Sequence, residues 1–182
     1  MKNQNIQFKA AALRCKIARL FLAFLAAAFI SAPNPTSASD QVPFNGTLAG
    51  CVETQEPIDQ CTIHAHAALF GNATHLGAFT GTGEFYQNFC ENPPNITYSG
   101  SFHFFAANGD ELFGTFEGYL SPTGAPGVYD NHETADATGG AGRFTNATGH
   151  WDAGGQIDVT TESLCFSLPL QGWISSVGSN RR

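Results

Sequence analysis

Apolar residues recur at every second position through most of the chain after residue 38, and clusters of Gly, Asn and Pro interrupt them. A period of two is typical of half-buried β-strands, and this part of the chain shows no sustained helical period. The pattern predicts eight strands, at 42–51, 61–70, 74–86, 96–107, 111–120, 128–135, 149–161 and 166–177. Their regular spacing and glycine-rich turns favour an all-β fold, a single antiparallel barrel that is closed or nearly closed.

The hairpin around Asn108-Gly109 is the clearest local signal, because Asn-Gly between alternating apolar runs favours a two-residue turn. On the strand before it Phe102 and Phe104 share one face, and Phe116 lies on the apolar face of the strand after it. The chain holds 16 phenylalanines, and inward aromatic rings either fill a small barrel or wall an apolar pocket. A packed core is the default interpretation. In the alternative, these three rings line a ligand site.

The segment Ala137–Gly155 contains six glycines, a density that helix or strand preference does not explain. Glycine permits positive φ and the close approach of neighbouring strands. We expect a tight turn at Gly139–Gly142, then a short coiled or single-turn segment held to the core by Phe144. A strand is expected to begin at Gly149.

The N-terminal segment has the composition of a secretory signal peptide. Residues 1–19 carry five basic side chains and no acid, and the apolar run Leu20–Ile30 follows. Eleven apolar residues are too few to cross a bilayer, which takes about 20. We expect cleavage after Ala38, which leaves 39–182 as one barrel domain. The mature chain is then secreted or periplasmic, with no membrane span.

The expected mature chain is strongly acidic. Three arginines stand against fifteen acidic residues after position 38, a formal charge of −12. Such a surface repels phosphate backbones, which excludes nucleic acid as a partner. It keeps the protein soluble by self-repulsion.

Four cysteines remain after the signal peptide, namely Cys51, Cys61, Cys90 and Cys165. An even number without a CxxC pair in an exported chain indicates two disulfides rather than a zinc site. An up-and-down barrel places every odd-numbered connection at one end, so all four cysteines should meet at one rim. We favour Cys51–Cys61 with Cys90–Cys165. The alternative, Cys51–Cys165 with Cys61–Cys90, would join the first strand to the last.

Four segments carry a resemblance to a known family. They are GNATHLGAFT (71–80), FHFFAANGDELFGTFEGYL (102–120), TGGAGRFTNATGHWDAGG (138–155) and QGWISSVGS (171–179). They resemble small exported bacterial proteins that are similar to the allene oxide cyclase and dirigent barrels, in which a TGGxGxFxxAxG-type segment precedes a late strand.

This resemblance implies an eight-stranded barrel with an internal cavity, no cofactor and, typically, a homotrimer. The plant members cyclise an unstable fatty-acid epoxide or steer the coupling of phenoxy radicals. Their catalytic residues do not carry over, because the match is confined to turn and strand glycines.

Histidines supply the sharpest candidate chemistry. His64 and His66 alternate on one strand and share a face, opposite the apolar Ile63 and Ala65. We expect both imidazoles on the barrel exterior, or in a polar cavity if the barrel is inverted. In either place they could bind Zn²⁺, Cu²⁺ or Ni²⁺, although spacing reveals no third ligand. Farther along, His103 and Glu117 lie on the polar faces of adjacent strands and could pair across the hairpin, as a surface pair rather than a catalytic dyad. No nucleophile elbow, HExxH helix or phosphate-binding loop is present.

Three functions fit these observations. The first is a secreted barrel that binds a small apolar or aromatic ligand without catalysis. The second is a cofactor-free isomerase or cyclase of the allene oxide cyclase kind, which also needs a buried carboxylate or an ordered water beside the ligand. The third is a disulfide-stapled structural or interaction module with a filled interior.

Overall fold

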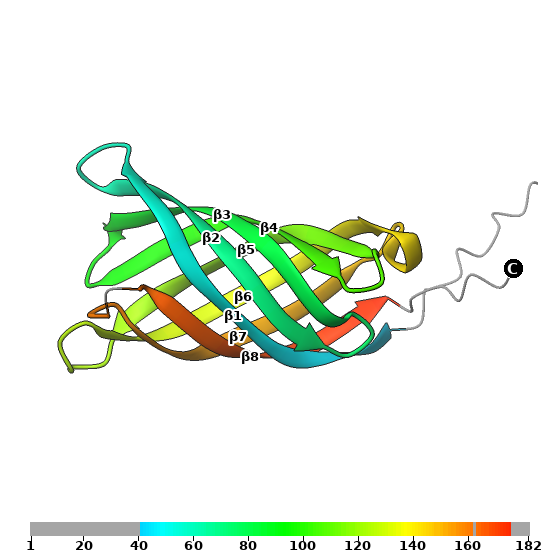
Figure 1. The fold of residues 1–182 in the computed structure, drawn as a ribbon. Coiled ribbons are helices and arrows are strands. Elements are labelled where there is room, and N and C mark those ends of the chain that lie inside the picture. The colour runs from blue at the N-terminus through cyan, green and yellow to red at the C-terminus, as the bar shows by residue number, and fades with distance from the viewer. Residues whose placement is uncertain (1–40, 162, 176–182) are drawn as a thin grey trace, which may run out of the picture. The chain divides into compact units, whose positions relative to one another are not determined.

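The chain folds into one closed antiparallel barrel of eight strands, which confirms the predicted fold class (Figure 1). The computed structural model describes residues 41–161 and 163–175, so the expected signal peptide lies outside the described residues. Each strand pairs with its neighbours in sequence, and the first strand pairs with the last. The strands are β1 (Gln41–Pro57), β2 (Thr62–Ala73), β3 (Gly77–Asn92), β4 (Asn95–Ala106), β5 (Glu111–Pro122), β6 (Val128–Ala141), β7 (Gly149–Asp158) and β8 (Cys165–Ser175).

The glycine-rich segment differs from its prediction at its start. Gly139 and Gly140 belong to β6, where they lie opposite Phe113 and Leu112 of β5, so the expected tight turn at Gly139–Gly142 is wrong. A Cβ on Gly139 would approach the Phe113 ring to 2.8 Å, so this glycine serves close packing. The chain turns at Gly142, whose φ is +65°, and forms the 3₁₀ helix η1 (Gly142–Phe144). The single turn, the buried Phe144 and the strand from Gly149 are confirmed.

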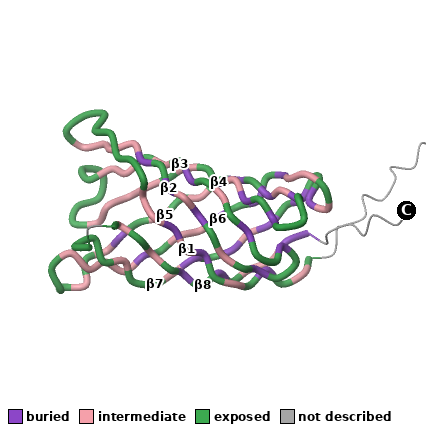
Figure 2. Tube along the Cα trace, in the orientation of Figure 1, coloured by how far each residue is buried: buried purple, intermediate pink, exposed green. Residues whose placement is uncertain are grey.

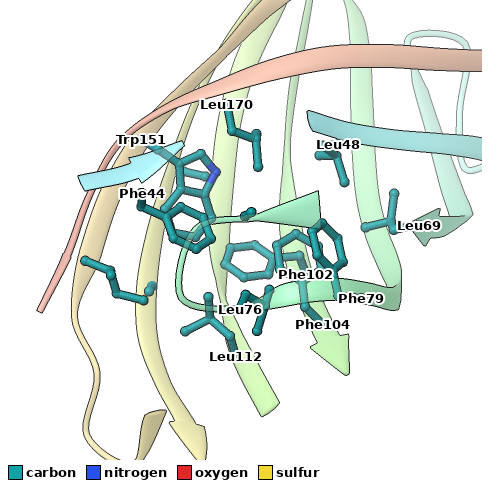
Figure 3. Packing of buried hydrophobic residues seen from close by; sticks show 14 of the residues in the cluster. Phe44, Leu48, Leu69, Leu76, Phe79, Phe102, Phe104, Leu112, Trp151 and Leu170 are labelled. Atoms are coloured by element: carbon teal, nitrogen blue, oxygen red, sulfur yellow. The ribbon is translucent and has the colours of Figure 1, made fainter. Parts of the chain in front are cut away.

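A packed aromatic core fills the end of the barrel that holds the β2–β3, β4–β5 and β6–β7 connections. Its largest fully buried side chains include Phe44, Phe104, Phe144 and Trp151. The rings of Phe44 and Trp151 lie 4.7 Å apart, and those of Phe102 and Phe104 lie 4.6 Å apart (Figure 3). Buried positions are concentrated toward this end, and the opposite loops are exposed (Figure 2). We call these the closed end and the open end.

One ion pair joins the three connections at the closed end. Asp110, in the β4–β5 turn, accepts hydrogen bonds from the backbone N–H and the Nε of Arg143 in η1. The Arg143 guanidinium also donates to the carbonyl of His75 in the β2–β3 turn over 3.2 Å. Burial acts to raise the pKa of Asp110, but hydrogen bonds from Arg143 and Asn108 outweigh it and hold this pKa below its usual value.

The disulfides are Cys51–Cys165 and Cys61–Cys90, so the favoured pairing is wrong and the alternative is the one present. The reason is strand length, because β1 continues six residues past Cys51 and carries the β1–β2 loop away from it. The ladder between β1 and β8 places Cys165 directly opposite Cys51. Cys61 immediately precedes β2, next to the end of β3 that carries Cys90, and all four cysteines lie toward the open end as predicted.

Helical structure is minimal in the described ranges. None of their helices has the length and apolar character needed to cross a membrane.

Candidate functional site

A cavity of about 440 Å³ occupies the barrel interior between the packed core and the open end. Leu48, Leu69 and Phe102 lie where it meets the core, and Gln55, Phe89 and Val159 lie near its mouth. Eight-stranded barrels have the width at which side chains either fill the interior or leave room for one small ligand. Here the interior is filled at one end and hollow at the other.

The cavity exists because small inward residues face large ones. Ala67, Gly83 and Ala135 lie in its wall at positions where larger side chains would fill the space. The three phenylalanines expected at a ligand site all border it. Phe102 and Phe104 are buried and continue into the core, whereas Phe116 is partly buried, with its ring 6.1 Å from those of Phe85 and Tyr98.

A polar cluster interrupts this apolar wall. The hydroxyl of Tyr98 on β4 lies 2.6 Å from Oδ1 of Asn131 and 3.1 Å from Oε2 of Glu133, both on β6. Nδ2 of Asn131 donates to the carbonyl of Ala153 on β7 over 3.0 Å, so Oδ1 is the atom left to accept from Tyr98. These hydrogen bonds fix the orientation of the cluster, and all three of its residues line the cavity.

Burial shifts both ionisable groups of this cluster toward their neutral forms. Burial raises the pKa of Glu133 to about 7, against a smaller lowering by the hydrogen bond with Tyr98. Burial, and then the charge of Glu133, raise the pKa of Tyr98 above its ordinary value. A hydroxyl has one proton, which Tyr98 gives to Asn131, so a neutral Glu133 can in turn donate to the Tyr98 oxygen. At neutral pH Glu133 is therefore close to the midpoint between its protonated and ionised forms.

Sequence reasoning did not single out Tyr98, Asn131 or Glu133. The available signal was the strand period, because Asn131, Glu133 and Ala135 alternate on the inward face of β6. Two polar side chains on an inward face mark either a satisfied network or a site. Their meeting with Tyr98 depends on the register of three strands.

The histidines on the outer face lie partly as expected. His64 and His66 point outward from β2, and the carboxylate of Glu84 on β3 lies beside them as a third candidate ligand, which spacing did not reveal. The expected pair of His103 with Glu117 is wrong. Register places Glu117 opposite Ser99, and His103 instead bonds to Glu111 over 2.8 Å.

Comparison of the chain with family models, curated proteins and solved structures yields no match. The resemblance to the allene oxide cyclase and dirigent barrels therefore stays a prediction.

Proposed function

We propose that this protein is an exported barrel that binds one small, largely apolar ligand in its interior cavity. The observation that carries the proposal is an apolar cavity of about 440 Å³ with one oriented polar cluster in its wall. Ligand sites have this composition, with apolar walls for affinity and a few polar groups for orientation. Two disulfides agree with an oxidising compartment.

The polar cluster indicates what kind of ligand fits. The single proton of a neutral Glu133 can turn from the Tyr98 oxygen to a ligand oxygen, whereas a ligand carboxylate would meet an acidic chain. A hydrocarbon or aromatic body with one hydroxyl or carbonyl oxygen satisfies both parts of the cavity. The exposed Phe89 and Val159 border the mouth and provide an apolar entrance.

A second candidate is a cofactor-free isomerase or cyclase. Glu133 is the specific observation in its favour, because a carboxyl with a pKa of about 7 can give and take a proton at neutral pH. Bound beside an oxygen of the substrate, it would protonate that oxygen while the apolar wall excludes water. This candidate requires turnover, which the first does not.

The binding experiment uses the neutral fluorophore N-phenyl-1-naphthylamine, displaced in turn by dodecane and by 1-dodecanol. Phe116→Ala removes a ring from the cavity wall, and Phe113→Ala removes an exposed ring from the outer face of the same strand. We expect saturable binding by the unmodified protein and by Phe113→Ala. In Phe116→Ala the fluorophore should bind at least tenfold more weakly, since burial against an aromatic side chain contributes about 1.5–3 kcal/mol.

Dodecanol should displace the fluorophore at lower concentration than dodecane, because only the alcohol can bond to the cluster. Absence of saturable binding, or equal loss in the two variants, would overturn the proposal.

A further inference from the structure

Three metal-ligating side chains meet on the outer face of β2 and β3, away from the cavity. The candidate ligand atoms of His64, His66 and Glu84 all lie within 4.8 Å of one another. The register places His66 directly opposite Glu84, and His64 opposite Tyr86. Because the inward residues of β2 pack in the barrel, its outward residues have no alternative direction.

His64 is held in place by its neighbours. Its ring stacks on Tyr86 with centroids 4.5 Å apart and an angle of 13°, and its Nε2 lies 2.9 Å from Oε1 of Glu84. Two ligands at about 2.1 Å from one ion lie about 3.0–3.4 Å apart in octahedral or tetrahedral geometry. The pair already has nearly this separation. The ring of His66 is centred 4.7 Å from that of His64, and its ligand nitrogen, within 4.8 Å of the other two ligand atoms, has to move closer to join them.

We propose that His64, His66 and Glu84 bind one divalent transition-metal ion, such as Zn²⁺ or Cu²⁺, on the outer wall of the barrel. Two imidazoles and one carboxylate suit these ions, whereas Mg²⁺ and Ca²⁺ prefer oxygen ligands. The site is open to solvent, so water completes the coordination. Glu56 lies opposite His64 on β1 and adds negative charge beside the cation.

The rest of the outer face provides internal controls. His103–Glu111 and His150–Asp136 are also histidine–carboxylate pairs with contacts of 2.8 Å, and neither has a second imidazole. Within the described residues, only the His64, His66 and Glu84 cluster brings three such ligands together. The proposal is independent of the ligand cavity, because these side chains point away from it.

Isothermal titration calorimetry with ZnCl₂ and with CuCl₂ on the untagged, disulfide-bonded protein tests this site. The variants are His66→Ala and Glu84→Gln, with His150→Ala as the matched control. We expect one ion per chain, tighter binding of Cu²⁺ than of Zn²⁺, and at least a tenfold weakening in His66→Ala and Glu84→Gln. His150→Ala should stay within about twofold of the unmodified protein.

Electron paramagnetic resonance of the Cu²⁺ complex adds a structural readout. Two imidazole nitrogens should couple to the copper in the unmodified protein, and one should remain in His66→Ala. Absence of saturable binding would overturn the proposal, as would binding that His66→Ala leaves unchanged. A loss of equal size in His150→Ala would also overturn it.

Discussion

The Tyr98 hydroxyl donates a 2.6 Å hydrogen bond to the side-chain carbonyl of Asn131, and this bond crosses an intervening strand. Gly118 of β5 lies between the two, opposite Tyr98 on one side and Glu133 on the other. A Cβ on Gly118 would come within 2.7 Å of the Tyr98 oxygen. The bare backbone of Gly118 therefore lets the phenol pass over β5 and reach the polar side chains of β6.

Removal of this hydroxyl in Tyr98→Phe should destabilise the protein. The change leaves the Asn131 carbonyl without its donor and deprives Glu133 of its partner. Loss of one partner from a buried hydrogen bond costs about 1–3 kcal/mol. Urea unfolding measures the difference. The exposed Tyr119 provides the control, since Tyr119→Phe should change stability by less than about 0.5 kcal/mol. Equal effects in the two variants would contradict the prediction.

Stability should fall as the pH rises from about 4.5 to 7, through the titration of Glu133. Its pKa is raised in the folded state, so in this range the folded protein holds a proton that the unfolded chain has lost. Each unit of pKa corresponds to about 1.4 kcal/mol, and the contribution is on the order of 3 kcal/mol.

Urea unfolding at pH 5 and pH 8 measures this change. Glu133→Gln should remove most of the loss of stability between pH 5 and pH 8, because an amide does not ionise. Glu117→Gln, on the outer face of β5, should retain it. A pH dependence that Glu133→Gln leaves intact would show that Glu133 is not its source.

The ion pair at the closed end should contribute stability above pH 4 and lose it below. The folded-state pKa of Asp110 is lowered, so its carboxylate contributes at neutral pH, and this contribution disappears as the pH falls through the folded pKa. Asp110→Asn should cost about 1–3 kcal/mol at pH 7, since it removes hydrogen bonds to a charged group. The difference in unfolding free energy between Asp110→Asn and the unmodified protein should shrink at pH 3.

Guanidinium unfolding at pH 7 and at pH 3 measures this stability difference at each pH. Asp152→Asn is the comparison, because this residue is exposed on the outer face of β7. A deficit in Asp110→Asn that stays constant with pH would contradict the assignment.

The two disulfides should differ in their contributions to stability. Cys51–Cys165 joins residues 114 apart in sequence, and Cys61–Cys90 joins residues 29 apart. In the chain-entropy description the longer loop restricts the unfolded chain more, by about 1 kcal/mol. The double variant C51S/C165S should therefore unfold at lower denaturant concentration than C61S/C90S.

Peptide mapping without reduction checks the pairing itself. A peptide that links Cys51 to Cys61 would contradict the structure. Equal midpoints for the two double variants would show that loop length does not govern their stability.

The period of two in the sequence determined which side chains point inward. It placed Phe102, Phe104 and Phe116 toward the interior and His64 and His66 toward solvent, because alternate residues of a strand face opposite sides. The count of eight strands and the position of all four cysteines toward one end followed from the same pattern and from up-and-down connectivity.

Only the tertiary structure decided which residues of different strands lie side by side. Because β1 continues six residues past Cys51, this cysteine pairs with Cys165 and not with Cys61. Strand register placed Glu84 beside the two histidines, and it placed Glu133 beside Gly118 and Tyr98. Whether the interior was filled or hollow depended likewise on where small residues such as Ala67 and Ala135 came to face larger ones. Face assignment is local to one strand, whereas register, strand length and barrel closure are set by all eight strands together.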